Sequence, residues 1–212
     1  MYDVVAYELS SQCRSVHCLY SCLKKRNHFN IDRVYCDLHD DFVVRKRVGD
    51  EFTYSFYQVK TKSKLNENWT VGEIFGLYVR ANDQNKQTPE KIKDSFVGKL
   101  LLHTVLFGDA CEKVVFQTNI HTDDDINDLH DDIVSNTFTN RFSIVLIKFF
   151  NSVYKDNIQE DLSEEEVKRL INKFNIETDV HYLKCGDHNF EPFAREQIYK
   201  YSEVDLGHEE CK

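Results

Sequence analysis

Proline and glycine are scarce in this sequence, and it has no long apolar run. The 212 residues include only 2 prolines and 7 glycines, which excludes collagen-like chains, linkers and glycine-rich nucleotide loops. No apolar stretch approaches the ~18 residues that a transmembrane helix needs, so no membrane association is expected. With 41% hydrophobic and 30% charged residues, the composition is that of a folded globular protein.

Several signatures of common enzyme families are also missing. The sequence has no G-x-S-x-G, P-loop or HExxH motif, so serine-hydrolase, NTPase and zincin functions have no support. The seven cysteines include no C-x-x-C pair, and the N-terminus does not resemble a secretory signal. We therefore expect a cytoplasmic protein with free, mostly buried thiols. A metal site at Cys18 and Cys22, which share a helical face, is the less favoured alternative.

Charge is negative overall but unevenly distributed. The net charge is −9, which argues against general affinity for nucleic acids because phosphates are bound by Lys and Arg. Residues 43–64, however, contain six basic and two acidic residues, whereas residues 109–132 contain eight acidic residues and one lysine. A basic surface on an acidic body is therefore compatible with the sequence, and the partner stays open at this point.

Apolar periodicity and capping residues predict an alternation of strands and helices. Strands are expected at 33–36, 41–47, 51–61 and 113–118, and Gly49-Asp50 is expected to form a hairpin turn. Helices are expected at 10–26, from Thr70 through Tyr78, from Thr88 to 107, from Ser163 to 174 and at 193–201. Residues 142–149 fit a strand or a helix, and 180–184 a short strand.

This order predicts an α/β fold with a mixed central sheet flanked by helices. The chain turns polar near residues 150–162. We therefore expect a core at 1–155 and a mostly helical C-terminal extension at 156–212 that packs on it.

One acidic residue and a Q-x-K triplet form the most informative pattern. Asp41 opens one strand of the predicted hairpin, and Gln58 and Lys60 share a face of the other because they are two residues apart. A carboxylate, an amide oxygen and the Val59 carbonyl are hard oxygen ligands that suit Mg²⁺. A neighbouring ammonium group can orient a metal-bound water or offset charge in phosphodiester hydrolysis.

Chance and solvation offer simpler explanations for such patterns. Q-x-K is a common triplet, and an acidic pair before a strand is often a turn. Lys60, however, lies in the apolar stretch FTYSFYQVK, where an ammonium needs acidic partners. The acidic run at Asp123–Asp125 lacks the EF-hand pattern and is expected to be a loop or helix start. Trp69 is expected to be a core residue rather than a base-stacking platform.

These motifs resemble a known nuclease family. The elements D-D-F-V-V, Y-Q-V-K-T-K, Trp69-Thr70 and Ser95–Leu100 are similar to restriction-endonuclease-like nucleases of the PD-(D/E)xK type in which Gln replaces the second acid. More specifically, they resemble the double-stranded-DNA endonuclease domain at the N-terminus of CBASS-type anti-phage effectors. The resemblance covers about residues 8–200 and is strongest at 36–62.

The resemblance implies a restriction-endonuclease-like core and a function in cutting duplex DNA with little sequence specificity. It implies Asp41, Gln58 and Lys60 as catalytic residues, with Asp41, Gln58 and the Val59 carbonyl holding Mg²⁺ or Mn²⁺. Two features depart from the family: its upstream glutamate corresponds most nearly to Asp37, and the cyclic-oligonucleotide sensor domain is missing from these 212 residues. We therefore expect activation by a sensor domain or partner protein. Because the net charge of −9 predicts a weak nuclease when isolated, we also expect an active homo-oligomer.

Phosphate contacts are expected from four basic residues near this pattern: Arg45, Lys46, Lys62 and Lys64. Two alternative functions stay open. One is a catalytically silent adaptor of the same fold that binds protein partners, which the Gln at position 58 and the acidic surface favour. The other is a nuclease with the same site that acts on RNA.

Overall fold

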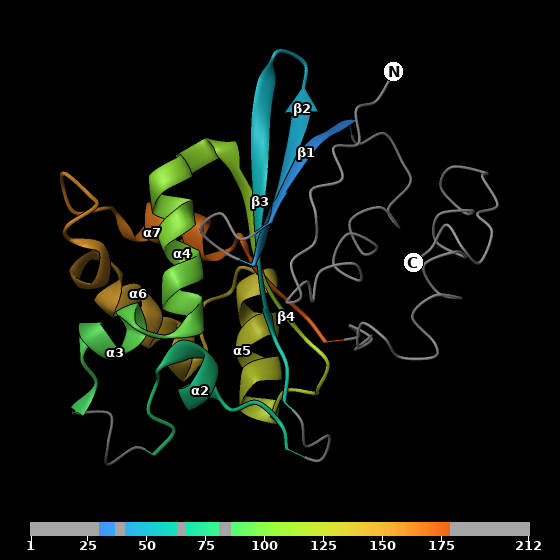
Figure 1. The fold of residues 1–212 in the computed structure, drawn as a ribbon. Helices are drawn as coiled ribbons and strands as arrows, with labels where there is room; N and C mark the ends of the chain where they lie inside the picture. Colours follow the sequence, from blue (N-terminus) through green and yellow to red (C-terminus); the bar gives the residue numbers. More distant parts are fainter. Residues whose placement is uncertain (1–29, 37–40, 63–66, 81–85, 179–212) are drawn as a thin grey trace, which may run out of the picture. The chain divides into compact units, whose positions relative to one another are not determined.

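A five-stranded mixed sheet organises residues 30–36, 41–62, 67–80 and 86–178, which are the residues that the computed structural model describes. The strands lie side by side in chain order (Figure 1): β1 (Asn30–Cys36), β2 (Phe42–Val48), β3 (Glu51–Lys60), β4 (Cys111–Thr118) and β5 (Phe174–Glu177). The first three strands are antiparallel, and β3, β4 and β5 are parallel. The expected α/β fold with a restriction-endonuclease-like core is confirmed.

The β2–β3 hairpin was predicted within one residue at its ends. Phe42 pairs with Tyr57, and Val48 pairs with Glu51 across the turn. Gly49 has a φ of 64° in that turn, a left-handed conformation that glycine adopts without a side-chain clash. The hairpin therefore fixes which residues of β2 and β3 face each other.

Parallel pairing of β3 and β4 requires a crossover, and three helices supply it. These are α2 (Val71–Phe75), α3 (Pro89–Lys93) and α4 (Phe96–Phe107), followed by the short 3₁₀ segment η2 (Gly108–Ala110). Helix α4 packs along β3 and β4 on one face of the sheet (Figure 1). The contact is aromatic: the ring of Phe56 stacks on that of His103 at 4.2 Å, and Phe107 packs against Phe56 and Tyr54.

Three of the predicted helices end or break earlier than expected, among them the one from Ser163, which ends at Ile171 rather than at residue 174. Thr70 forms the predicted capping box with Glu73, but α2 ends at Gly76, whose φ of 68° is left-handed, so Leu77 and Tyr78 lie beyond the helix. The helix predicted from Thr88 to residue 107 is divided, because Ser95 accepts a hydrogen bond from the Gly98 N–H and caps a new helix. A Cβ atom at Gly98 would lie 1.8 Å from the carbonyl oxygen of Ile92, so this tight break requires glycine.

Three further helices and one strand complete the described part of the fold. Residues 142–149 belong to a helix, α6 (Arg141–Tyr154), which settles the ambiguity in their periodicity. Helix α5 (Asp124–Val134) precedes it, and α7 (Glu164–Ile171) begins at the predicted Ser163 capping box. Strand β5 was not predicted, and it joins the sheet of the 29–180 unit.

Some predictions lie outside the described residues: the helices at 10–26 and 193–201, the strand at 180–184, and the pair Cys18 and Cys22. The domain boundary at 155/156 stays a prediction. Among the described residues, no helix is both long and apolar enough to span a membrane.

Candidate active site

Asp41 lies directly before β2 and turns its carboxylate toward β3. Because Phe42 pairs with Tyr57, one further step of the register places Asp41 opposite Gln58. Its Oδ2 atom accepts a hydrogen bond of 2.6 Å from the Val59 N–H and lies 3.3 Å from the Lys60 Nζ. The Asp41 carboxylate thus continues the hydrogen-bonded ladder one step beyond the pair of Phe42 and Tyr57, and it brings a negative charge to the end of β3.

Gln58 and Lys60 face the same side of the sheet, as their spacing predicts. This is the side of Phe56, which packs on α4, and the Lys60 ammonium lies 5.7 Å from the centre of the Phe96 ring at the start of that helix. The Lys60 side chain is 27% exposed and that of Asp41 is 41% exposed. The ammonium is therefore neither sealed beneath aromatic rings nor separated from the acid by the sheet.

The amide oxygen of Gln58 is the atom that most clearly fits a bound cation. Its Oε1 atom is buried, and no hydrogen-bond donor among the described residues reaches it. Buried oxygens of this kind are nearly always satisfied in folded proteins, so the Gln58 Oε1 atom needs a partner. A bound cation would supply that partner without any change in the protein.

The backbone of Val59 adds a further oxygen on the same side. In a strand the N–H and C=O groups of one residue point to the same edge, and the Val59 N–H points to Asp41. The Val59 carbonyl therefore also points to the β2 side of β3, toward Asp41 and beyond the last backbone pair of the two strands. One carboxylate, one amide oxygen and one carbonyl fit Mg²⁺, which prefers oxygen ligands and retains several waters.

This donor set differs from the common clusters of charged or sulfur ligands. In the described ranges, no group of three or more His, Cys, Asp or Glu side chains is arranged to hold a metal ion. A site made of one carboxylate, one amide oxygen and one backbone carbonyl does not contain such a group, so this finding does not bear on it. Asp37 and Asp40, which the sequence offers as additional acids, lie outside the described residues.

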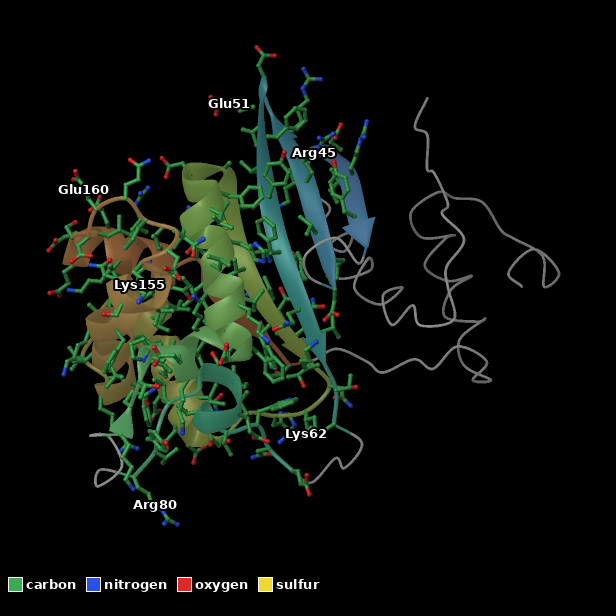
Figure 2. All side chains as sticks on the ribbon, turned by 60° about the vertical axis from the view of Figure 1, so that its left-hand side comes forward. Arg45, Glu51, Lys62, Arg80, Lys155 and Glu160 are labelled. Carbon is green, nitrogen blue, oxygen red and sulfur yellow. The ribbon has the colours of Figure 1, made fainter. Side chains whose placement is uncertain are left out.

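The predicted phosphate contacts are engaged with acidic residues. Arg45 forms an ion pair with Asp32 and also lies over the Phe52 ring, and Lys46 pairs with Glu112 at 2.7 Å. Neighbouring strand residues point to opposite faces, so only Arg45 shares the face of Asp41, four residues further along β2. Figure 2 shows Arg45 toward the turn and Lys62 at the other end of the hairpin. Lys64 lies outside the described residues.

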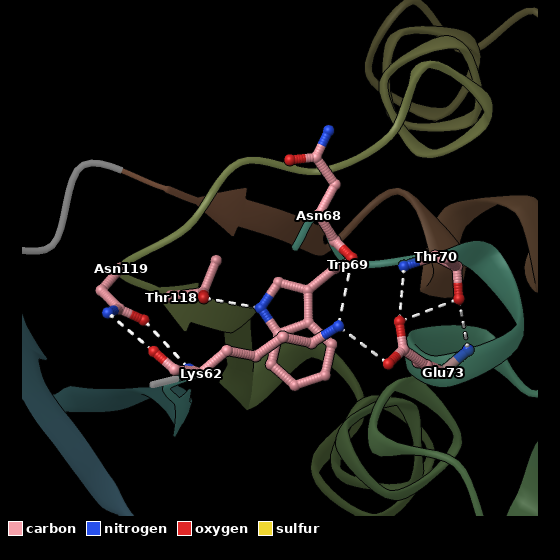
Figure 3. A network of polar contacts seen from close by, with 7 residues as sticks. All are labelled: Lys62, Asn68, Trp69, Thr70, Glu73, Thr118 and Asn119. Atoms are coloured by element: carbon pink, nitrogen blue, oxygen red, sulfur yellow. Dashed lines mark hydrogen bonds and ion pairs between the residues drawn. The ribbon is translucent and has the colours of Figure 1, made fainter. Parts of the chain in front are cut away.

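The cluster around Lys62 was not foreseen. Lys62 pairs with Glu73 at 2.8 Å, and the buried Trp69, whose ring lies against the Lys62 ammonium, donates from its indole Nε1 to Thr118 at 2.7 Å (Figure 3). Trp69 is thus the core residue that was predicted. The K-T-K and W-T-x-x-E segments contain these residues, but nothing in the sequence indicates that Lys62 reaches across to Glu73.

Other conspicuous side chains have structural roles. Asp123 caps α5, as the helix-start interpretation of the acidic run predicts. Cys111 is a buried free cysteine, and burial raises the pKa of its thiol to about 12, so it is not a nucleophile at neutral pH. The candidate site is therefore confined to the end of β3 and the residues facing it.

Comparison with known proteins identifies the family of the chain. The model of one protein family, described as "Cap4, dsDNA endonuclease domain", matches residues 15–204. No curated protein and no solved structure gives a significant match. The match covers most of the sequence, including every described residue of the sheet and the helices that cover it. The chain belongs to the Cap4 double-stranded-DNA endonuclease domain family.

Proposed function

We propose that this chain cuts both strands of duplex DNA by metal-dependent hydrolysis at the end of β3, with little sequence specificity. The observation that carries the proposal is the Gln58 amide oxygen, buried without a donor among the described residues and opposite an aspartate that already orients Lys60. Membership of a DNA endonuclease family supports the substrate class.

Asp41, Gln58 and the Val59 carbonyl would hold the cation, with Mg²⁺ preferred and Mn²⁺ accepted. When bound, such an ion supplies a Lewis acid for the phosphate and lowers the pKa of a bound water. Asp41 also holds Lys60 in place through its Oδ2 atom, 3.3 Å from the ammonium. Lys60 in turn donates to the attacking water or to the phosphate oxygen that gains negative charge.

Binding would depend mainly on phosphates, through Arg45 and Lys64, whereas Lys46 points to the opposite face and pairs with Glu112. Arg45 must exchange its acidic partner for a phosphate, and the whole chain carries a charge of −9. We therefore expect weak binding that falls steeply with salt. A sensor domain or partner protein, and assembly into a homo-oligomer that presents two sites to two strands, would compensate, as suits an effector in anti-phage defence.

Plasmid cleavage tests the proposal. The wild-type protein with Mg²⁺ is expected to nick and then linearise supercoiled plasmid, and EDTA or the substitution Lys60→Ala is expected to abolish the reaction. Cleavage that persists unchanged in Lys60→Ala would show that the assigned chemistry is wrong. Preference for RNA in a competition assay would indicate the RNA-directed alternative. Inactivity of the homo-oligomeric protein toward both duplex DNA and RNA would indicate the catalytically silent adaptor.

A further inference from the structure

Lys62 is held within the protein by its whole side chain. Its Nζ atom donates to Glu73 at 2.8 Å and to the carbonyl oxygen of Asn68 at 3.1 Å, and lies 4.3 Å from the centre of the Trp69 ring (Figure 3). The side chain is only 16% exposed. Two of the three ammonium donors are therefore used, and the charge is further stabilised by the indole face.

The main chain at Lys62 is held as well. The Lys62 N–H donates to the side-chain oxygen of Asn119 at 3.3 Å, and the Asn119 amide donates back to the Lys62 carbonyl at 3.4 Å (Figure 3). The ladder between β3 and β4 ends at the pair Lys60 and Thr118. The Asn119 side chain thus extends the order of the sheet past Lys60.

A line of aromatic contacts connects Lys62 to Lys60. The Trp69 indole, held by Thr118, packs edge-on against Phe96 at 6.0 Å and 85°. Phe96 lies beneath the Lys60 ammonium at 5.7 Å. The Lys62 ammonium therefore lies against the Trp69 ring, and the Lys60 ammonium lies against the Phe96 ring.

Glu73 fixes the far side of this arrangement. Its carboxylate accepts hydrogen bonds from Lys62 and from Thr70, the residue that caps α2. Burial alone would raise the pKa of Glu73, but these hydrogen bonds lower it overall, so the group is ionised at neutral pH. The end of β3 is thereby tied to the first turn of α2.

We propose that Lys62 is a positioning residue for the Lys60 ammonium, acting through Trp69 and Phe96, and that it does not bind DNA phosphates. This replaces the role expected for Lys62 from the sequence. The inference rests on the proposed function, in which Lys60 acts at the scissile phosphate. The two roles give opposite expectations for Glu73. If Lys62 positions Lys60, it needs Glu73 as its ion-pair partner. If Lys62 bound a DNA phosphate, Glu73 would compete with that phosphate for the ammonium.

The test uses Lys62→Met, Lys62→Arg and Glu73→Gln, with Lys168→Met as the matched control. Lys168 is also ion-paired, with Glu164, and also lies over an aromatic ring, that of Phe138 at 5.9 Å, but it belongs to α7. Methionine keeps the length of the side chain without its charge. Glutamine at position 73 retains the capping box, and arginine at position 62 can pair with the acid and stack on the indole.

We expect Lys62→Met and Glu73→Gln each to slow plasmid cleavage about tenfold at saturating DNA, since small misplacement of a catalytic group has effects of this size. Binding of a short duplex in EDTA should keep the same Kd and salt dependence in both variants. Lys62→Arg should recover most of the rate, and Lys168→Met should match the wild type. A salt slope reduced by about one in Lys62→Met, with tighter binding in Glu73→Gln, would overturn the proposal.

A second measurement is independent of cleavage. In ¹³C-lysine-labelled protein, the Hε–Cε signal of Lys60 is identified by its absence in Lys60→Ala, and its position depends on the nearby Phe96 ring. We expect this signal to shift in Lys62→Met and to stay in place in Lys168→Met. An unmoved signal would overturn the inference even in an active nuclease. A shifted signal in a protein that cuts no DNA would contradict the proposed function alone.

Discussion

Two aspartates in this fold, Asp41 and Asp132, are surrounded in opposite ways. Asp132 is buried, and both of its oxygens accept hydrogen bonds from the turn between α5 and α6 and from the first turn of α6. These donors are the hydroxyls of Thr137, Thr139 and Ser143 and the N–H groups of Thr139 and Asn140. Asp41 is 41% exposed, and its hydrogen bonds with the described part of the chain, to Val59 and Lys60, are made through Oδ2.

The difference separates a structural carboxylate from one that is available for chemistry. Burial alone would raise the pKa of Asp132, but hydrogen bonds from Ser143, Thr137 and the neighbouring N–H groups hold it far below its usual range. The Oδ1 atom of Asp41, by contrast, receives no hydrogen bond from the described residues, and the Gln58 amide oxygen on the paired strand is also without a donor among them. A ligand would therefore bind at Asp41, whereas Asp132 has no capacity left.

The largest expected effect is on cleavage, at Asp41. Asp41→Asn should reduce the rate of plasmid cleavage at least about 100-fold, because it removes the carboxylate that we propose as a metal ligand and that is also the partner of Lys60. Its free energy of unfolding, measured with urea, should stay within about 1 kcal/mol of the wild type, since the side chain is exposed. Nearly full cleavage by this variant would remove Asp41 from the site.

Asp132→Asn should show the reverse pattern. The amide cannot accept from every donor that the carboxylate satisfies, so we expect a loss of about 2 kcal/mol in the free energy of unfolding. The cleavage rate of the folded fraction should not change. If Asp132→Asn were as stable as the wild type but did not cleave DNA, Asp132 rather than Asp41 would be the carboxylate that takes part in the chemistry.

The contribution of Asp132 should also depend on pH in a definite direction. Its pKa is lowered on folding, so its stabilisation is complete above the ordinary aspartate value of about 3.9 and declines as the pH falls below it. Urea unfolding at pH 7 and pH 3 should therefore show a smaller difference between wild type and Asp132→Asn at pH 3. A difference that grows on acidification would contradict this account.

Substitutions at Gln58 should change the metal requirement. Gln58→Glu adds a second carboxylate and should lower the Mg²⁺ concentration for half-maximal cleavage several-fold, whereas Gln58→Ala should raise it by roughly tenfold. A Mg²⁺ titration of the cleavage rate measures both. If the two variants respond to Mg²⁺ as the wild type does, Gln58 is not a ligand.

The smallest expected effect is at Arg45, four residues along β2 from Asp41. Arg45→Ala should weaken duplex binding uniformly across sequences and reduce the salt slope by about one, with little effect on the rate at saturating DNA. Fluorescence anisotropy at several salt concentrations measures this. An unchanged slope would leave Arg45 as the partner of Asp32 alone.

Local signals made much of this fold predictable. Gly49 marked the hairpin turn, and Thr70 and Ser163 marked helix starts through their spacing to a glutamate. The spacing of Gln58 and Lys60 placed them on one face, and the hairpin brought Asp41 opposite them. These features depend on residues close in sequence or joined by a short turn.

Features that depend on distant contacts were not predictable. The predicted long helix divides at Ser95, where the Ile92 carbonyl comes so close to Gly98 that a Cβ atom would not fit, and no periodicity reveals this contact. Strand β5, FNIE, has too few residues for a pattern and exists through pairing with β4. The partners Glu73 of Lys62 and Glu112 of Lys46 come from other elements, so exposed-looking lysines proved to be paired.

Binding of Mn²⁺, followed by electron paramagnetic resonance, tests the central claim most directly. Titrated with Mn²⁺ in the absence of DNA, the wild-type protein should bind the ion at a site that is lost in Asp41→Asn and weakened in Gln58→Ala. Asp132→Asn should bind like the wild type. Equal Mn²⁺ binding by wild type and Asp41→Asn would contradict the account, because the ion would then be held elsewhere.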